Sequence, residues 1–177
     1  AWSVYRRSSE IGCRCEEAAR AWASLVLKVA GVRVIMENKG VIDSSSPQVL
    51  VTNHVSWIDV LVLAAFVPGR YVFVAKKEVE RIPVFGAAVR ACGHIYIDRG
   101  DRARALASLD VARKRLEEAA PTVIIFPEGT RSNTGELGSF KKGAFVLAIQ
   151  TGVSVVPAAI FGSRQVMKRG SFLINSG

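Results

Sequence analysis

The sequence predicts an α/β fold with a mostly parallel central sheet that is flanked by helices. Short apolar runs rich in Val and Ile alternate along the chain with longer stretches of helical spacing. These runs are continuous and do not alternate apolar with polar residues, which is typical of strands buried on both faces. No Pro-, Gly- or Ser-rich linker divides the 177 residues, so residues 32–177 are expected to form one α/β domain.

Residues 1–31 are predicted to form an N-terminal segment built around an amphipathic helix. Within it, residues 16–30 carry apolar side chains at helical spacing, with Lys28 and nearby arginines available for a polar side. The apolar residues are Trp22, Leu25, Val26 and Val29. Two interpretations fit this pattern equally well. The helix packs on the domain core, or it lies in a membrane interface with its basic residues at the headgroups.

The remaining apolar runs set the predicted order of strands and helices. The expected strands are VRVIM at 32–36, QVLVT at 48–52, YVFVA at 71–75, HIYI at 94–97, TVIIF at 122–126 and VSVVPAAI at 153–160. The expected helices lie near residues 57–67, 83–92, 101–119 and 141–151. In the helix at 101–119, the stripe expected to be buried against the sheet consists of Leu106, Leu109, Ala112 and Leu116.

The composition favours an anionic partner and indicates no segment that spans a membrane. The 24 Lys and Arg exceed the 15 Asp and Glu, and the net charge of +9 favours phospholipid surfaces, phosphorylated substrates or nucleic acid. We expect no nucleic-acid partner, because neither a basic stripe with interleaved aromatic residues nor a known binding module is visible. The longest apolar run is residues 60–67, whereas a membrane-spanning helix needs about 20 apolar residues.

The cysteines and the chain ends carry less information. Cys13, Cys15 and Cys92 are an odd number without CxxC or Cys/His metal spacing, so we expect free thiols, no disulfide framework and no metal site. A reducing compartment fits this expectation. The chain begins with Ala rather than Met and ends after FLINSG, which is compatible with a fragment that is truncated at its C-terminus.

His54 and Asp59, in NHVSWID at residues 53–59, form a candidate catalytic pair. On one helix, an offset of five residues would leave their side chains roughly 140° apart. If His54 instead follows the strand at 48–52 and Asp59 opens the next helix, the carboxylate can turn back to the imidazole. The simpler interpretation is a capping histidine and an aspartate favoured at a helix N-terminus. Polar residues between an apolar strand and an apolar helix favour the functional interpretation.

The segment FPEGTRS at residues 126–132 is a candidate anion site. Pro127 and Gly129 predict a tight turn after the buried strand, with exposed backbone N–H groups beside polar side chains. Those side chains are Glu128, Thr130, Arg131 and Ser132. An ordinary polar loop is the alternative interpretation. An Arg between Thr and Ser favours an anion, and Lys141 and Lys142 add to the positive field.

Two further cations follow predicted strands. Arg99 in YIDR and Lys76 after YVFVA lie at the carboxyl ends of strands, where open α/β sheets build their sites. Taken alone, Arg99 is more typical of a surface ion pair with Asp98 or Asp101, and Lys76 of a solvated side chain. His94, which begins a strand without an obvious partner, is interpreted as structural.

Four blocks in this order resemble the glycerolipid acyltransferases, and within them the 1-acylglycerol-3-phosphate (lysophosphatidate) acyltransferases. NHVSWID matches the H-x4-D motif of that family, YIDR its second block, FPEGTRS its third and VVPAAI its proline-containing fourth. AKKE and KKGAF are also similar to family segments, so the resemblance covers roughly residues 20–177. The family usually continues past the fourth block and is often anchored by apolar N-terminal helices, whereas here only the amphipathic stretch remains.

The resemblance implies transfer of a fatty acyl group from acyl-CoA or acyl carrier protein to the free sn-2 hydroxyl of 1-acylglycerol-3-phosphate. The product would be phosphatidate, in phospholipid biosynthesis. By this resemblance His54 is the general base and Asp59 orients it, while Arg99 and Arg131 hold the acceptor phosphate. Lys76 is a weaker candidate for the same anion. The residues implied to shape the acceptor pocket are Glu128, Gly129 and Thr130. No metal or cofactor is implied, because the thioester is a co-substrate.

The partners implied are a membrane lipid surface, lysophosphatidate and the acyl donor, with the protein at the cytoplasmic face of a membrane and without a transmembrane helix. Three alternatives stay open. The acceptor is another lysolipid or glycerol-3-phosphate, or His54 activates water and the protein hydrolyses acyl thioesters, or the chain is a non-catalytic lipid-binding protein. Arg99 and Arg131 favour a phosphate on the acceptor and leave its other groups open.

Overall fold

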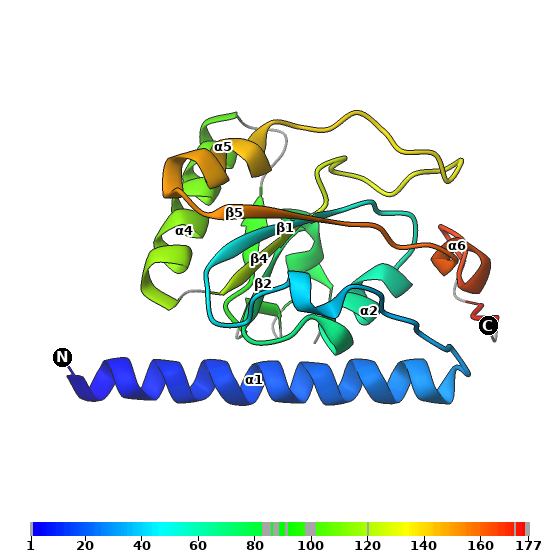
Figure 1. Ribbon diagram of the computed structural model, residues 1–177, viewed down its shortest axis with the longest axis horizontal. Helices are drawn as coiled ribbons and strands as arrows, with labels where there is room; N and C mark the ends of the chain where they lie inside the picture. Colours follow the sequence, from blue (N-terminus) through cyan, green and yellow to red (C-terminus); the bar gives the residue numbers. More distant parts are fainter. Residues whose placement is uncertain are drawn as a thin grey trace.

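The computed structural model describes residues 2–82, 86, 89–90, 92–97, 102–119, 121–171 and 173–175. Within these residues a sheet of five parallel strands, in the order β3-β2-β4-β1-β5, forms the centre of the molecule (Figure 1). The strands are β1 (Gln48–Thr52), β2 (Tyr71–Lys76), β3 (Ile95–Ile97), β4 (Thr122–Ile125) and β5 (Ser154–Ala158). The predicted α/β class with a mostly parallel sheet is therefore confirmed.

Helices cover both faces of this sheet (Figure 1). The helices on one face are α1 (Trp2–Val29) and α2 (Ile58–Phe66), and those on the other are α4 (Arg102–Ala119) and α5 (Gly143–Thr151). The shorter described helices are α6 (Ser163–Val166) and the 3-10 helices η1 (Lys39–Val41) and η2 (Lys77–Arg81). Because both faces are covered, β1 and β4 are buried along their whole lengths.

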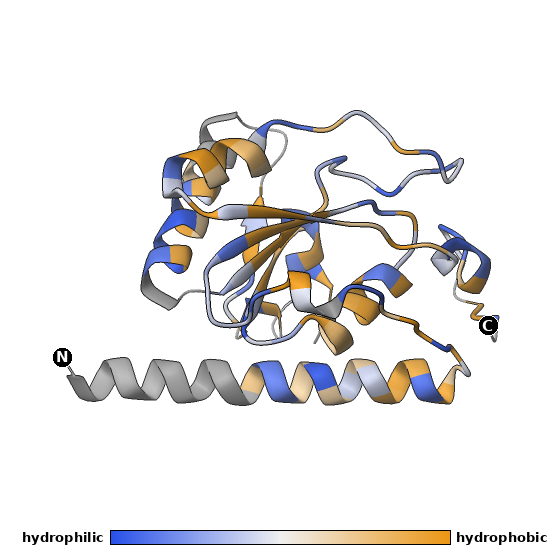
Figure 2. Cartoon of the chain, viewed as in Figure 1, coloured by the Kyte–Doolittle hydropathy of each residue, from blue (hydrophilic) through white to orange (hydrophobic). Residues whose placement is uncertain are grey.

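The sheet separates two apolar layers, since neighbouring residues of a strand point to opposite faces. The layer towards α4 and α5 includes Val49, Val123, Leu116 and Leu147. The layer towards α1 and α2 includes Leu50, Ile124, Ala23 and Leu63. Figure 2 shows the central strands coloured mostly as hydrophobic, whereas α1 and α4 carry both hydrophobic and hydrophilic residues.

Two expected elements differ from the structure, and a third cannot be compared with it. Residues 32–36 form no strand, because Val32 and Val34 pack against Leu27 and Ile58 of the helices and the segment pairs with no described strand. The N-terminal helix begins at Trp2, well before the expected start at residue 16. The helix expected at 83–92 lies largely outside the described residues. In the expected stripe of α4, the side chain of Leu106 also lies outside them, whereas the other members pack in the core as predicted.

Cys15 and Cys92 form a disulfide, so the expectation of free thiols is wrong for this pair. Their Cα atoms are 5.4 Å apart although 77 residues separate them in the sequence, and this distance suits a disulfide. Cys15 belongs to α1 and Cys92 lies shortly before β3. Only the packing of α1 on the domain brings these two cysteines together, and their spacing in the sequence carries no sign of it.

Helix α1 is apolar on two sides. Ala23 and Leu27 are buried towards the domain, and Arg20 donates hydrogen bonds to three carbonyl oxygens at the end of α2. These acceptors, at 2.6–3.2 Å, are the carbonyls of Ala65, Val67 and Gly69. On the outer side Trp22, Leu25 and Val29 are 53%, 58% and 80% exposed. The helix therefore packs on the core and still presents an apolar stripe to its surroundings.

Candidate active site

His54 lies in the loop between β1 and α2, and Asp59 lies in the first turn of α2. The Nδ1 atom of His54 is 2.8 Å from Oδ2 of Asp59. The predicted turn of the carboxylate back to the imidazole is thus confirmed. The pair occupies the carboxyl end of a parallel strand in the middle of the sheet, where open α/β folds build their sites.

Asp59 is fully buried, and its Oδ2 atom has three hydrogen-bond partners. Besides the imidazole, the backbone N–H groups of Val55 and Ser56 donate to Oδ2 at 2.7 and 2.8 Å. A carboxylate only accepts hydrogen bonds, so this pattern assigns the imidazole proton to Nδ1 and leaves a lone pair on Nε2. The ring of His54 can therefore take a proton at Nε2, and Asp59 would stabilise the resulting cation.

The imidazole is held in place by a second aromatic ring. His54 stacks on Phe126, with ring centroids 3.9 Å apart and planes inclined by 19°. Its side chain remains 15% exposed, so the ring is partly accessible from outside. The nearby hydroxyl of Ser56 is fully buried and donates to the carbonyl of Met167 at 2.7 Å. Ser56 therefore points away from His54, and the arrangement lacks the hydroxyl–imidazole contact of an activated serine nucleophile.

The FPEGTRS segment holds the backbone of His54 from both sides. Oε1 of Glu128 accepts the N–H of His54 at 2.9 Å, and the N–H of Ser132 donates to the carbonyl of His54 at 2.8 Å. Oε2 of Glu128 accepts the N–H of Gly138 at 2.8 Å. The buried carboxylate of Glu128 is thus bonded to two backbone amides and joins the histidine loop to the following loop. Its expected part in the acceptor pocket stays a prediction.

The tight turn predicted at Pro127 and Gly129 is present. Gly129 has a φ of 74°, which favours glycine, and its N–H donates to the carbonyl of Phe126 at 3.0 Å. This amide and that of Ser132 are therefore used inside the protein, whereas we expected exposed amides here. A Cβ atom at Gly129 would lie 3.1–3.2 Å from the side chain of Lys141, which crosses the turn. Thr130 is exposed beside it.

Arg131 lies on the ring of Trp57, with its guanidinium carbon 5.1 Å from the ring centroid. Partial burial and the neighbouring guanidinium of Arg169 lower the pKa of Arg131, while the carboxylate of Asp59 acts in the opposite direction. The guanidinium of Arg131 therefore lies within electrostatic range of the His54–Asp59 pair. Within the described part of the chain, it donates no hydrogen bond and forms no ion pair.

The predicted anion-binding roles of Lys76 and Arg99 have less structural support than that of Arg131. Lys76 ends β2 and its ammonium group lies 2.9 Å from Oε1 of Glu78, in an exposed ion pair. Such a pair contributes little to stability and can open to a ligand. Arg99 lies outside the described residues, two positions after the end of β3. Because β3 runs parallel to β2, the chain leaves both strands at the same edge of the sheet.

Comparison with known proteins supports this interpretation of the site. Residues 33–161 match the acyltransferase family. The chain belongs to the acyltransferase family. The resemblance predicted from NHVSWID, YIDR, FPEGTRS and VVPAAI is thereby confirmed, because all four blocks lie inside the matched residues.

The curated relatives of this family member are named as 1-acyl-sn-glycerol-3-phosphate acyltransferases. A chloroplastic one from Arabidopsis thaliana is 36% identical over 153 residues, which is 86% of this chain and 42% of the relative. One from Chlamydomonas reinhardtii is 40% identical over 124 residues, or 70% of this chain and 37% of the relative. This chain spans less than half the length of both relatives.

A solved structure supports the same membership at the level of the fold. The crystal structure of the 1-acyl-sn-glycerophosphate (LPA) acyltransferase PlsC from Thermotoga maritima has a TM-score of 0.78 and 28% identity with this chain. The similarity covers 90% of this chain and 63% of PlsC. The parallel sheet and its flanking helices are therefore an architecture that this family member shares with PlsC.

Asn53, the first residue of NHVSWID, is a site residue that was not predicted from the sequence. Its side-chain amide donates to the carbonyl of Ile160 at 2.9 Å, and its side-chain oxygen accepts the N–H of Ile160 at 2.8 Å. This two-fold contact joins the histidine loop to the chain after β5. The sequence offered two signals for this contact. Asn53 is a polar residue directly before His54, and Ile160 ends the fourth block, VVPAAI.

A cavity of about 510 Å³ opens next to the histidine loop. Its wall contains Asn53 and Val55, the two neighbours of His54 in the sequence. The other walls are mainly apolar and come from the end of β5, the loop at 134–140 and α6, including Pro157, Leu137, Phe140 and Phe161. A volume in this range suits a small-molecule or lipid ligand.

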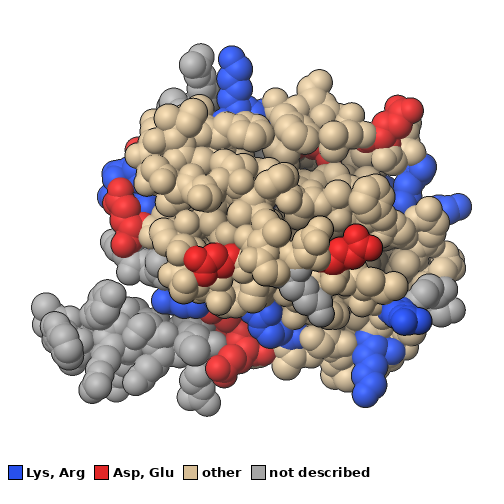
Figure 3. All heavy atoms as spheres, viewed as in Figure 1, with Lys and Arg blue, Asp and Glu red and all other residues tan. Residues whose placement is uncertain are grey.

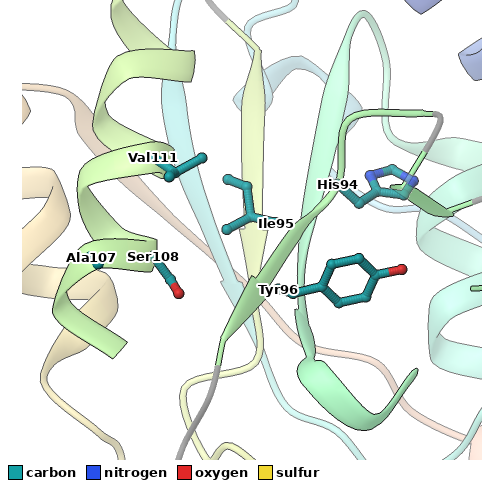
Figure 4. Close-up of a pocket in the computed structure, with 6 residues that line it drawn as sticks. All are labelled: His94, Ile95, Tyr96, Ala107, Ser108 and Val111. Atoms are coloured by element: carbon teal, nitrogen blue, oxygen red, sulfur yellow. The ribbon is translucent and has the colours of Figure 1, made fainter. Parts of the chain in front are cut away.

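A smaller cavity of about 250 Å³ lies between β3 and α4, and none of its lining residues belongs to the histidine site. Figure 4 shows Ile95 directed towards Val111 of α4, while the rings of His94 and Tyr96 point to the other side of β3. Nδ1 of His94 accepts the N–H of Phe73 at 3.2 Å, and burial lowers the pKa of His94 to about 4. His94 is thus a neutral, structural residue, as interpreted from the sequence.

Among the described residues, no group of three or more His, Cys, Asp or Glu side chains could hold a metal ion. In the same part of the chain, no helix contains an apolar stretch long enough to cross a membrane.

Proposed function

We propose that this acyltransferase transfers a fatty acyl group from acyl-CoA or acyl carrier protein to the free sn-2 hydroxyl of 1-acylglycerol-3-phosphate and forms phosphatidate. The observation that carries the proposal is the geometry of His54, whose Nδ1 is bound to buried Asp59 at 2.8 Å and whose Nε2 keeps a free lone pair. The activity for which the curated relatives and PlsC are named supports the choice of substrate. The protein would act in phospholipid biosynthesis.

In the proposed reaction, His54 Nε2 removes the proton of the acceptor hydroxyl as its oxygen attacks the carbonyl carbon of the thioester. The new C–O bond produces a tetrahedral oxyanion. The C–S bond then breaks, the carbonyl re-forms, and the leaving thiolate takes the proton from the His54 imidazolium. Asp59 stabilises the imidazolium between these two proton transfers. No acyl-enzyme is formed, in keeping with the buried Ser56 hydroxyl that donates to Met167.

Arg131 would bind the phosphate of the acceptor. Its guanidinium carbon lies 5.1 Å from the centre of the Trp57 ring, and among the described residues the group donates no hydrogen bond, so its donors are available to a ligand. Arg99 and Lys76 are proposed as further contacts to the same anion, and Glu128, Gly129 and Thr130 as walls of the acceptor pocket. A planar guanidinium binds phosphate oxygens in a bidentate manner, which favours a phosphorylated acceptor over a neutral one.

An acyl chain would occupy the cavity of about 510 Å³ that is lined by Asn53 and Val55 of the histidine loop, although His54 itself does not line it. Its apolar wall removes hydrocarbon from water, and burial of each CH₂ group stabilises the complex by about 0.8 kcal/mol. The adjacency of Asn53 and Val55 to both the cavity and the catalytic histidine supports this placement. The thioester is a co-substrate in this scheme, and no resident metal or cofactor is required.

A membrane lipid surface is the proposed partner of the whole domain, at the cytoplasmic face and without insertion of a spanning helix. The outer stripe of Trp22, Leu25 and Val29 on α1 suits the boundary between headgroups and acyl chains. The net charge of +9 suits the anionic lipids of a cytoplasmic leaflet. Both substrates carry acyl chains, so binding at a membrane would place the site where they are concentrated.

Product analysis tests the proposed function. Purified protein is incubated with a labelled acyl-CoA, with and without 1-acylglycerol-3-phosphate, and lipids are separated. We expect labelled phosphatidate only when the acceptor is present. Free fatty acid formed at the same rate in both reactions would contradict acyl transfer and support a thioester hydrolase. Acylation of another lysolipid or of glycerol-3-phosphate in a parallel panel would instead change the acceptor and leave the reaction class intact.

A further inference from the structure

Arg169 is an arginine outside the four sequence blocks that reaches the Arg131 loop. It lies in the turn after α6 (Ser163–Val166). Its Nη1 atom donates to the carbonyl of Arg131 and to the side-chain oxygen of Asn133, each at 2.6 Å. These two bonds fix its guanidinium against the segment that follows the FPEGTRS turn. Its Nε and Nη2 atoms have no hydrogen-bond partner within the described part of the chain.

Arg169 brings a second positive charge to Arg131, because its guanidinium is bonded to the backbone carbonyl of Arg131. The charge of Arg169 contributes to the lowered pKa of Arg131, which shows that the two guanidinium groups interact electrostatically. No described carboxylate forms an ion pair with either group. Asp59, the carboxylate that acts on Arg131, is already bound through Oδ2 to His54 and two backbone amides. Two neighbouring cations without a counter-ion favour the binding of an anion.

The space-filling view agrees with this local excess of positive charge. Figure 3 shows several Lys and Arg side chains at the end of the molecule that carries α6, beside wide uncharged areas of the same face. Lys141 adds a further cation to this end, because its side chain crosses the turn at Gly129. Lys141 therefore adds a further positive charge to the turn that precedes Arg131.

We infer that Arg169 is a second guanidinium of the acceptor site and contacts, together with Arg131, a phosphomonoester dianion. This inference rests on the proposed function and deepens it, because it specifies the headgroup class. A phosphomonoester carries close to two negative charges at neutral pH, whereas a phosphodiester headgroup carries one. Two guanidinium groups match the monoester better. The site is thus expected to prefer acceptors that end in a free phosphate.

Arg164 provides a matched control from the same helical region. Its Nη1 donates to the carbonyl of Thr134 and its Nη2 to the carbonyl of Asn133, so both terminal nitrogens are occupied by backbone. Arg164 therefore supports the same loop as Arg169, but both of its terminal nitrogens are already bonded to backbone carbonyls. A loss of loop support affects both arginine variants alike, whereas a loss of phosphate binding affects Arg169 alone.

The kinetic experiment compares Arg169→Gln, Arg169→Lys, Arg164→Gln and Arg113→Gln, the last as a charge control on α4. With lysophosphatidate, Arg169→Gln is expected to raise the acceptor KM about tenfold with little change in kcat or donor KM. Arg169→Lys is expected to recover part of this loss, because it retains the charge without the planar fork. Arg164→Gln should raise the acceptor KM by less than half as much, and Arg113→Gln should match the wild type.

The same proteins are assayed with a lysophospholipid that has a phosphodiester headgroup. The preference of the wild type for the monoester should shrink severalfold in Arg169→Gln. An equal rise of acceptor and donor KM, or identical effects of Arg169→Gln and Arg164→Gln, would assign Arg169 to loop support and overturn the inference.

A binding measurement separates this inference from the proposed reaction. Glycerol-3-phosphate is titrated into each protein by calorimetry, which needs no turnover. If the wild type forms no phosphatidate yet binds this phosphomonoester about tenfold more tightly than Arg169→Gln does, the proposed reaction fails and the anion site stands. Equal affinity of the wild type and Arg169→Gln would overturn the anion site whatever the outcome of the acylation assay.

Discussion

The catalytic proposal depends on which nitrogen of His54 carries the proton. Three donors converge on Oδ2 of Asp59, namely the imidazole of His54 and the amides of Val55 and Ser56. A carboxylate oxygen accepts these three bonds, so the proton of the neutral imidazole lies on Nδ1 and the lone pair on Nε2. The same backbone amides also order the loop, so the residues that fix the base are the residues that begin α2.

Replacing His54 with Ala removes the base, and we expect kcat to fall by about 10²–10⁴. Asp59→Asn should also lower kcat strongly, because its amide group cannot serve as an ionised partner for both Nδ1–H and the imidazolium. Initial rates of phosphatidate formation measure both effects, with His94→Gln as a histidine control in a separate part of the sheet. His54→Ala with more than a tenth of wild-type activity would argue against general-base catalysis.

His94 provides a pH-dependent term in the stability of the fold. Burial lowers its pKa from 6.5 to about 4, and its Nδ1 accepts the N–H of Phe73 only in the neutral ring. Between pH 6.5 and pH 4, His94 is protonated in the unfolded chain but stays neutral in the native state. This contribution to stability is therefore complete above pH 6.5 and is lost as the pH falls towards 4. The loss is on the order of 3 kcal/mol.

Denaturant unfolding at pH 7 and at pH 5 tests this expectation. The free energy of unfolding of the wild type should fall between the two pH values more steeply than that of His94→Gln. Glutamine keeps an acceptor for Phe73 and lacks a titrating ring. The same pH dependence in both proteins would assign the effect to other groups.

At the scale of elements, the inner face of α1 packs on the domain and its outer face is exposed. The inner face carries Ala23 and Leu27 in the core and the hydrogen bonds from Arg20 to the end of α2. The disulfide between Cys15 and Cys92 adds a covalent link to the chain before β3. Because the inner face is occupied, the outer stripe is free to meet a lipid surface without release of the helix from the domain.

The outer stripe of α1 is tested by Leu25→Ser combined with Val29→Ser. Burial of these two side chains in lipid would contribute a few kcal/mol, so the double variant should bind anionic vesicles at least about tenfold more weakly. Ile149→Ser on α5 is the control, since Ile149 is 81% exposed on the opposite side of the sheet. Vesicle co-sedimentation gives the partition coefficients. Equal weakening by Ile149→Ser would contradict membrane binding through α1.

At the scale of the whole molecule, the net charge of +9 is expected to govern the approach to the proposed anionic partners. An excess of this size attracts anionic lipid and phosphorylated substrates over a distance set by the ionic strength. The apolar stripe of α1 would then hold the protein at the surface after the approach. Electrostatic attraction and hydrophobic contact therefore respond differently to salt.

Binding to vesicles that contain anionic lipid should weaken as salt is raised from about 0.1 M to about 1 M, where the Debye length falls from about 10 Å to about 3 Å. Binding to neutral vesicles should change little, because it depends on apolar contact alone. Co-sedimentation over a salt series measures both. If binding to the anionic vesicles did not depend on salt, the net charge would not contribute to membrane association.

The sequence predicted most strands correctly because their signals are local. QVLVT at 48–52 coincides with β1, and TVIIF at 122–126 differs from β4 by one residue. The segment at 32–36 has the same apolar composition, but its packing partners are helices rather than strands. Composition alone cannot distinguish a buried strand from an irregular segment with buried side chains, because both need apolar residues and only the strand needs a backbone partner.

The sequence by itself determined the α/β class and the pairing of His54 with Asp59, because periodicity and short offsets are local properties, and its charge predicted an anionic partner. Only the tertiary structure decided contacts between distant residues. It directs Glu128 to the amide of His54 across 74 residues, joins Cys15 to Cys92 across 77, and brings Arg169 to the Arg131 loop across 38. These contacts depend on strand order and helix packing, which arise from the burial of the whole core rather than from any one segment.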